Sequence, residues 1–229
     1  MNITPEDVTT RADALYGARE QAEGVRASVE LLRAGGEPQG YEAAWRLGRA
    51  LFFLGQEACD EEEARSSHAD AVRASLRAAR LEPGRVEGHF WLGVNYALLA
   101  RLERRRLKAL ASALRARRSL GRAVRLDPAY HGAGPLRVLA RLQSRLPFVL
   151  GGGRGRARVN YERAISLAPA NTVTRLYFAE LLLETGDDTR ARLELEALLN
   201  LPFDSGWAFE IRRDRRIARE LLNGLAGKS

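Results

Sequence analysis

The chain has 229 residues, of which 45% are hydrophobic, 29% are charged and 7% are aromatic. This length and composition exclude a disordered chain and fit a protein that buries a core. The net charge of +8 is carried almost wholly by arginine, a bias that we interpret as compositional, so we expect no nucleic-acid partner.

The N-terminal residues Met1–Pro5 show no charged, apolar or cleavage region of a secretory leader. The apolar runs are too short and too interrupted to cross a bilayer, so we expect no transmembrane segment. The location is left open: cytoplasmic if the chain is complete, periplasmic if a leader has been removed. Cys59 is the single cysteine, which excludes a disulfide within the chain.

Good helix formers dominate the sequence, and no stretch alternates over the length of a strand. We predict an all-α chain and a single domain over 1–229, with an N-terminal hairpin at 1–36, repeat hairpins at 39–202 and a capping helix at 206–224. In chain order, helices are expected near residues 5–19, 22–34, 39–56, 61–81, 85–102, 105–126, 134–146, 153–168, 171–185, 188–200 and 206–224.

Prolines mark a repeat. Pro83 and Pro128 are 45 residues apart, and each ends an apolar helical run, as does Pro169. Small and apolar positions recur at the same offset: Leu47-Gly48 with Leu92-Gly93, Ala71 with Ala116, and Ala78 with Ala123. Small residues allow two antiparallel helices to approach closely, and a terminal proline fixes the turn into the next hairpin.

This pattern resembles the tetratricopeptide (TPR) repeat, whose unit has about 34 residues. Two units here are longer by about 11 residues, or about three helical turns, which keeps the same face inward. We therefore predict a TPR-type α-solenoid of about 11 helices in which the hairpins at 39–82 and 85–127 are unusually long.

In such a repeat the first helix of each hairpin lines the concave side. The positions expected there are mostly apolar or aromatic: Trp45, Arg49, Phe52, Phe53, Phe90, Val94 and Leu98. Exposure of an apolar surface of this size to water is unfavourable in free energy. Either the C-terminal helix with Trp207, Ile211, Ile217, Leu221 and Leu222 packs inward as a cap, or the face holds an apolar ligand or a partner helix.

Arginines form a second pattern at helical spacing, opposite the small positions of the expected 105–126 helix. The stripe consists of Arg115, Arg118, Arg122 and Arg125. A solvated outer face is one interpretation. A docking patch for an acidic partner protein is the other.

No set of residues in the sequence has the pattern of a catalytic site, and we expect no enzyme, no metal site and no cofactor. The three histidines share no helical spacing: His68 is expected to be solvated, His89 to be packed or at the surface, and His131 to be structural. The Gly151–Gly153 run lacks the ending of a phosphate loop, so a glycine turn is favoured over an anion site beside Arg154 and Arg156.

Three segments carry a resemblance to a family: residues 86–96, residues 126–141 with Gly134-Pro135-Leu136-Arg137, and the Leu146-Pro147 turn that runs through Leu150-Gly151-Gly152 to Tyr161. Over residues 40–222 the chain resembles the T-component family of TRAP (tripartite ATP-independent periplasmic) transporters.

The resemblance implies a bacterial, non-catalytic accessory protein. Its expected partners are a substrate-binding protein of the transporter and an apolar small molecule in a hydrophobic cleft. It also implies self-association as a homo-oligomer. A general protein-interaction scaffold, acting through the arginine stripe or through self-association, is the alternative.

Overall fold

The computed structural model describes residues 5–19, 22–34 and 40–227. Within these ranges the chain is all α-helical and contains no strand. The chain divides into two compact units, residues 1–127 (unit 1) and residues 128–229 (unit 2). A single domain therefore stays a prediction, and parts of the predicted hairpin at 1–36 lie outside the described residues.

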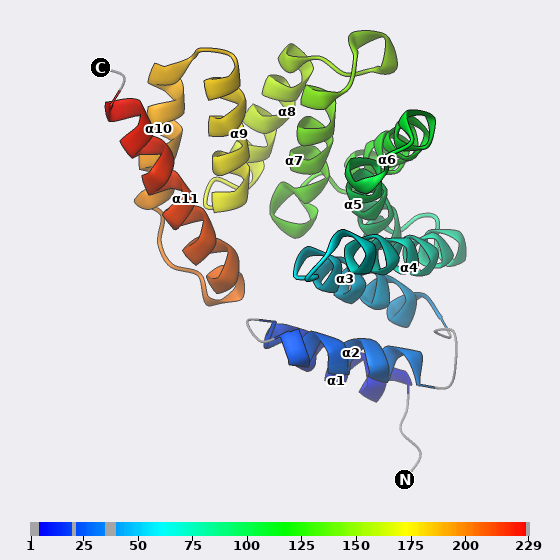
Figure 1. The fold of residues 1–229 in the computed structure, drawn as a ribbon. Helices are drawn as coiled ribbons and strands as arrows, with labels where there is room; N and C mark the ends of the chain where they lie inside the picture. Colours follow the sequence, from blue (N-terminus) through cyan, green and yellow to red (C-terminus); the bar gives the residue numbers. More distant parts are fainter. Residues whose placement is uncertain (1–4, 20–21, 35–39, 228–229) are drawn as a thin grey trace. The chain divides into compact units, whose positions relative to one another are not determined.

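Unit 1 consists of helices that pack on their neighbours along the chain (Figure 1). In order they are α1 (Pro5–Gly17), α2 (Ala22–Arg33), α3 (Tyr41–Gln56), α4 (Glu61–Leu81), α5 (Val86–Leu102) and α6 (Arg106–Leu126). The pairs α3–α4 and α5–α6 are the predicted long hairpins, and α4 and α6 each have 21 residues. The longer repeat is therefore confirmed as longer helices rather than longer loops.

Small residues let these helices approach closely. Ala71, Ala78, Ala116 and Ala123 are all fully buried, as the repeat predicts. Gly88 brings α5 against the end of α4, because a Cβ at this position would lie 2.6 Å from the backbone nitrogen of Ala79. The α4 helix begins where the Asp60 carboxylate accepts hydrogen bonds from the amides of Glu62 (2.9 Å) and Glu63 (2.8 Å).

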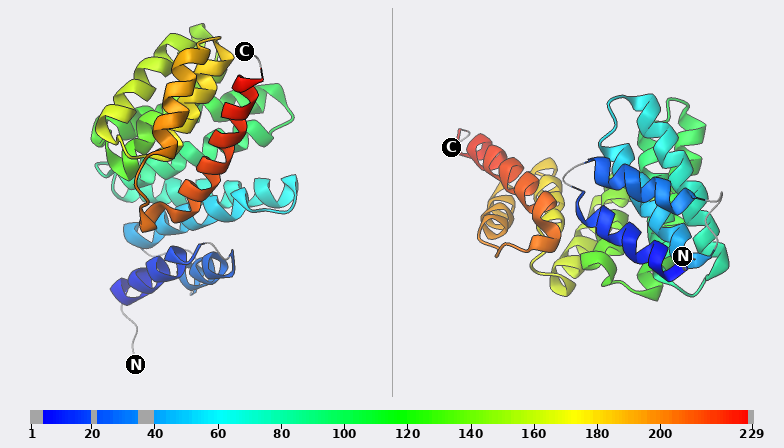
Figure 2. Two further views of the ribbon diagram at one scale, coloured as in Figure 1. Left: turned by 90° about the vertical axis from the view of Figure 1, so that its left-hand side faces the viewer. Right: turned by 90° about the horizontal axis from the view of Figure 1, so that it is seen from below.

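Unit 2 continues the series of antiparallel helices along the chain (Figure 2). Its elements are α7 (Tyr130–Arg145), the 3₁₀ turn η1 (Phe148–Leu150), α8 (Arg154–Leu167), α9 (Thr172–Glu184), α10 (Asp188–Leu199), η2 (Ser205–Trp207) and α11 (Ala208–Ala226). The positions that the repeat predicts as core are fully buried in α8 and α10: Ala157, Tyr161, Ala164, Ala191 and Leu195.

The C-terminal helix α11 caps unit 2. It packs on α9 and α10, with Ala218 and Leu225 buried in a cluster that also holds Leu176, Leu195 and Leu198. Ile217, Leu221 and Leu222 are partly buried against the same cluster. The predicted capping helix is thus confirmed, although it begins at Ala208 and the preceding Trp207 belongs to η2.

The expectation for His68 is wrong. Its side chain is 1% exposed in α4 and lies beside Gly55, where a Cβ would come within 2.7 Å of the imidazole. Its Nδ1 lies 3.0 Å from the Asn95 Oδ1, and the Asn95 amide donates to the carbonyl oxygen of Trp91 at 2.8 Å. Burial lowers the pKa of His68, partly offset by the bond to Asn95, so the buried imidazole is neutral.

Candidate binding surfaces

The seven residues of the predicted concave face are divided between core and surface of unit 1. Trp45, Phe53, Phe90 and Val94 are buried, with at most 8% of each exposed. Arg49, Phe52 and Leu98 are partly exposed. Phe52 also contacts the core, because its ring centroid lies 5.3 Å from that of Trp91. A ligand-binding role for these residues stays a prediction.

Arginines cover the aromatic rings at the start of this face. The Arg46 guanidinium lies 4.3 Å from the centroid of the Trp45 ring, and that of Arg49 lies 4.0 Å from the Tyr16 ring. The same two arginines form ion pairs with Asp13 of α1, at 2.8 Å for Arg46 and 2.5 Å for Arg49. The face that was predicted from the spacing of apolar residues is therefore covered by arginines that are ion-paired with a carboxylate.

This charged layer extends from α3 to α5. Arg85 pairs with Glu42 at 2.5 Å and with Glu87 at 2.7 Å, and the Tyr41 hydroxyl donates to Glu87 at 2.6 Å. Burial alone would raise the pKa of Glu42, but the bonds from Trp45, Arg46 and Arg85 outweigh it and lower that pKa. These carboxylates are ionised and engaged at neutral pH.

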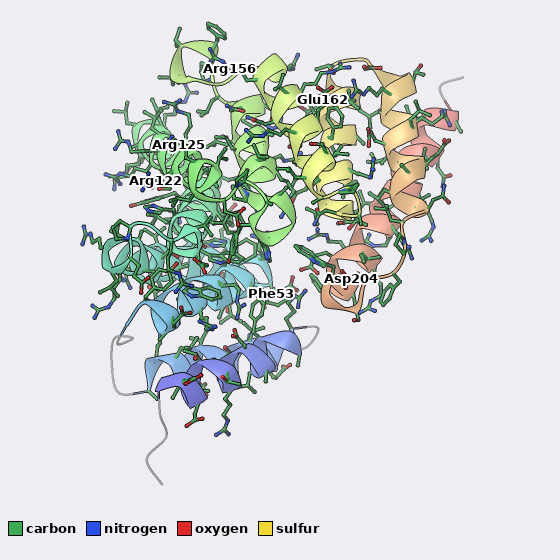
Figure 3. The ribbon with its side chains drawn as sticks, turned by 180° about the vertical axis from the view of Figure 1, so that it is seen from behind. Phe53, Arg122, Arg125, Arg156, Glu162 and Asp204 are labelled. Atoms are coloured by element: carbon green, nitrogen blue, oxygen red, sulfur yellow. The ribbon has the colours of Figure 1, made fainter. Side chains whose placement is uncertain are left out.

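The arginine stripe on α6 has the opposite character. Arg115, Arg118, Arg122 and Arg125 are all exposed, and α6 contains no acidic residue. Arg122 donates to the carbonyl oxygen of Pro83 at 3.3 Å, yet within the described residues no member of the stripe forms an ion pair. Figure 3 shows Arg122 and Arg125 together on one side of their helix. The stripe is therefore a positively charged surface whose arginines are not neutralised by ion pairs within the described residues.

Unit 2 contains a polar site at the start of α7 that the sequence did not predict. His131 (φ 52°), Gly132 (φ 61°) and Ala133 (φ 56°) form a left-handed turn, which is costly for residues other than glycine. A Cβ at Gly132 would lie 2.7 Å from the Asn171 Nδ2, so a larger residue there would have to displace the Asn171 side chain. The His131 ring lies 4.8 Å from that of Trp207, which gives it the predicted structural role.

Arg137 fixes this turn from inside the unit. The residue is 5% exposed, and its Nη1 donates to the Gly132 carbonyl oxygen (2.8 Å), the Asn171 Oδ1 (3.2 Å) and the Thr174 Oγ1 (3.3 Å). Burial lowers the pKa of Arg137, yet an arginine this basic stays charged. A buried cation therefore connects α7 to the beginning of α9.

Asp214 of α11 is a buried anion in the same unit. Its carboxylate accepts from the Thr172 hydroxyl at 2.7 Å and from Arg213 Nη2 at 2.7 Å. Burial raises the pKa of Asp214 although Arg213 opposes the shift. Arg137 and Asp214 together place charge in the interior of unit 2, where the α8–α9 connection meets α11.

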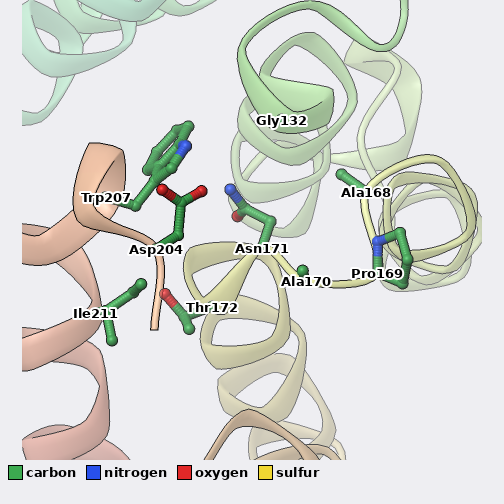
Figure 4. A pocket seen from close by; sticks show the side chains of 9 residues that line it. All are labelled: Gly132, Ala168, Pro169, Ala170, Asn171, Thr172, Asp204, Trp207 and Ile211. Carbon is green, nitrogen blue, oxygen red and sulfur yellow. The ribbon is translucent and has the colours of Figure 1, made fainter. Parts of the chain in front are cut away.

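A small cavity of about 190 Å³ opens beside the turn (Figure 4). The α8–α9 connection supplies an apolar wall with Pro169, whereas Trp207 and Ile211 form the opposite side. Asn171 and Asp204 bring the polar groups, although Asn171 already accepts from the Thr174 amide as the cap of α9. The cavity is too small for a drug-sized ligand, for which pockets measure about 300 Å³ or more.

The described histidines and the cysteine belong to no cluster that could hold a metal ion. Among the described residues, no three His, Cys, Asp or Glu side chains lie close enough together to hold a metal ion. His89 is partly exposed, with Nε2 3.1 Å from the Pro83 carbonyl oxygen, and Cys59 is exposed. The described helices also include none with the length and apolarity needed to cross a membrane.

The fold matches that of a solved TPR protein. A thermophilic TPR protein of Thermus thermophilus superposes with a TM-score of 0.70 and 22% sequence identity, covering 94% of this chain and 98% of that chain. Yeast Tom70 gives a TM-score of 0.36 at 12% identity, covering 98% of this chain and 62% of that chain. The first likeness shows the TPR fold.

No curated protein matches the sequence. A family model does: residues 43–225 match the TRAP transporter T-component. The match includes both units and the segments around Gly93, Arg137 and Gly152 from which the resemblance was inferred. Because it spans more than half of the sequence, the chain belongs to the TRAP transporter T-component family.

Proposed function

We propose that the chain is a non-catalytic accessory protein that binds a partner protein, and that this partner is the substrate-binding protein of a TRAP transporter. The family match and the TPR fold indicate a protein-interaction role.

The surface that we assign to this partner is the stripe of Arg115, Arg118, Arg122 and Arg125. The contrast with the face of α3 and α5 supports the choice. There, Arg46, Arg49 and Arg85 are paired with carboxylates, whereas the stripe has none within the described residues. Unpaired exposed charge of one sign steers a partner of opposite charge and sets its orientation.

The test replaces Arg115, Arg118 and Arg122 with Glu and measures binding to the purified substrate-binding protein by titration calorimetry. Like charges would then face the acidic partner, and we expect the Kd to rise by about tenfold or more. The control replaces Arg80, Arg163 and Arg219 with Glu. These residues are exposed and their replacement changes the net charge equally.

The control variant should bind like the unaltered protein. Equal weakening by both variants would show a long-range effect of net charge and exclude the stripe as the docking surface. If the unaltered protein binds no TRAP substrate-binding protein at all, the proposed function itself fails.

We also propose that an apolar ligand binds at the partly exposed side chains of Phe52 and Leu98, which lie on α3 and α5. Phe52 bridges surface and core through its contact with Trp91, so a ligand at this position would touch a ring that is already held in place. Native mass spectrometry of the purified protein would report a bound apolar molecule together with the subunit number. Retention of that molecule by a folded Phe52→Asp variant would remove Phe52 from the site.

A further inference from the structure

The loop between α7 and α8 presents two neighbouring apolar side chains to solvent. Phe148 is 70% exposed and Val149 is 87% exposed, and both belong to η1. Figure 1 shows this connection projecting past the ends of α7 and α8. Single exposed apolar residues are ordinary, whereas these two are adjacent and offer one continuous apolar surface at the tip of a projecting turn.

The turn holds this tip in one conformation. The amide of Gly151 donates to the Phe148 carbonyl oxygen at 2.9 Å, and that of Gly152 donates to the Pro147 carbonyl oxygen at 3.0 Å. Gly151 takes a left-handed conformation (φ 80°), and a Cβ at Gly152 would lie 1.9 Å from the Leu146 carbonyl oxygen. A backbone that is already hydrogen-bonded in this turn loses little conformational entropy when it binds.

Positive charge surrounds the tip. Arg154 and Arg156 are exposed at the start of α8, and the Arg156 guanidinium lies 4.4 Å from the centroid of the Phe148 ring. Figure 3 shows Arg156 next to this loop. Other arginines of this region do not add to the charge of the tip, because Arg141, Arg145 and Arg158 are ion-paired with carboxylates of α8, α9 and the α9–α10 turn.

We propose that residues 147–156 dock on a bilayer that contains anionic lipids. Phe148 and Val149 enter the boundary between headgroups and acyl chains, and Arg154 and Arg156 contact the lipid phosphates. The convex shape favours this occupant, because a projecting tip enters a deformable bilayer directly, whereas a protein partner must supply a matching groove. This inference goes beyond the proposed function and does not rest on it.

Flotation with lipid vesicles tests the proposal. The unaltered protein should float with vesicles of equal parts phosphatidylcholine and phosphatidylglycerol, and less with pure phosphatidylcholine. The double variant Phe148→Ser, Val149→Ser should lose about tenfold or more in vesicle partitioning. Arg154→Gln and Arg156→Gln should each lose about fivefold, and added salt should reduce this difference.

Matched controls come from the same unit. Val159 and Leu193 are 62% and 61% exposed on α8 and α10, so Val159→Ser with Leu193→Ser removes comparable apolar surface elsewhere. Arg163→Gln removes an exposed arginine of α8 away from the loop. Circular dichroism checks that every variant is folded, and both controls should float like the unaltered protein.

A fluorophore distinguishes insertion from adsorption by charge alone. Nitrobenzoxadiazole attached to Val149→Cys in a Cys59→Ser background should brighten on anionic vesicles, whereas the same label at Val159→Cys should not. The proposal is overturned if the unaltered protein does not float, if the Phe148, Val149 variant floats equally well, or if the label at 149 stays dim. Loss of binding to a protein partner in that variant, without loss of flotation, would assign the loop to protein contact instead.

Discussion

Units 1 and 2 bury their polar groups in different ways. Unit 1 has a neutral buried pair, in which His68 lies where Gly55 leaves room for its ring and Asn95 donates to the Gly48 carbonyl oxygen at 3.3 Å. In unit 2 two of the buried polar residues are charged, namely Arg137 behind a left-handed turn and Asp214 on α11. The buried pair of unit 1 thus depends on a close approach of helices, whereas the two buried charges of unit 2 depend on charge-assisted hydrogen bonds.

The largest effect is expected from removing the buried charge of Arg137 in unit 2. Arg137→Met leaves the Gly132 carbonyl oxygen without its buried donor and weakens the bonding of Asn171 and Thr174, so we expect a loss of about 2 to 3 kcal/mol in the free energy of unfolding. Urea unfolding measures this loss, and hydrogen exchange should confine the lost protection to unit 2. Arg163→Met, at an exposed site on α8, should change stability by less than about 0.5 kcal/mol. Equal effects of the two variants would contradict the assigned role of Arg137.

The next effect tests close backbone approach in unit 1. Gly88→Ala places a Cβ 2.6 Å from the Ala79 nitrogen and 3.0 Å from the Ala78 carbonyl carbon, atoms that cannot rotate away. We expect a loss of about 1 to 3 kcal/mol by urea unfolding. Gly84→Ala is the control, because a Cβ there meets no atom within 4 Å. A Gly88→Ala protein as stable as the control would show that α4 and α5 can separate at little cost.

The smallest effect concerns pH, for which the two units should respond with opposite sign. Burial lowers the pKa of His68 below 6.5, so the unfolded chain binds a proton first and unit 1 loses stability as pH falls below about 6.5. Burial raises the pKa of Asp214 above 3.8, so folded unit 2 binds a proton first and gains stability as pH falls through that raised pKa.

Two variants isolate these contributions, each limited to about 1.4 kcal/mol per pH unit. As the pH falls, the stability of the unaltered protein should decrease relative to His68→Gln and increase relative to Asp214→Asn, measured as urea midpoints across the acidic range. Parallel curves for either pair would show that the buried group does not change its protonation on unfolding.

The helices and their pairing could be predicted from the sequence because the repeat places small residues where helices touch. The 45-residue spacing of Ala71 and Ala116, and of Gly48 and Gly93, marks the positions at which neighbouring helices touch. His68 was missed because its polar neighbours in sequence suggested solvent. The repeat offered a signal, since 45 residues later the equivalent position is Ala113, which is buried in α6.

The site could be predicted only in part, for a similar physical reason. Exposure of Arg115 and Arg118 follows from helical periodicity alone. The Arg46 guanidinium over Trp45 pairs with Glu42, which the i,i+4 spacing within α3 can indicate, and with Asp13 of α1, which no spacing within α3 can indicate. The turn at His131 is likewise invisible locally, because its left-handed backbone is stabilised by Arg137 and Trp207 from other turns and segments.

The extra length of α4 and α6 has a consequence for how such proteins vary. At 1.5 Å per residue, a helix of 21 residues is about 32 Å long, whereas the 12 residues of α10 give about 18 Å. Hairpin length and repeat number are therefore independent parameters. A lineage can widen the footprint that one repeat offers by inserting whole turns, and the inward-facing alanines keep their places without a new repeat being added.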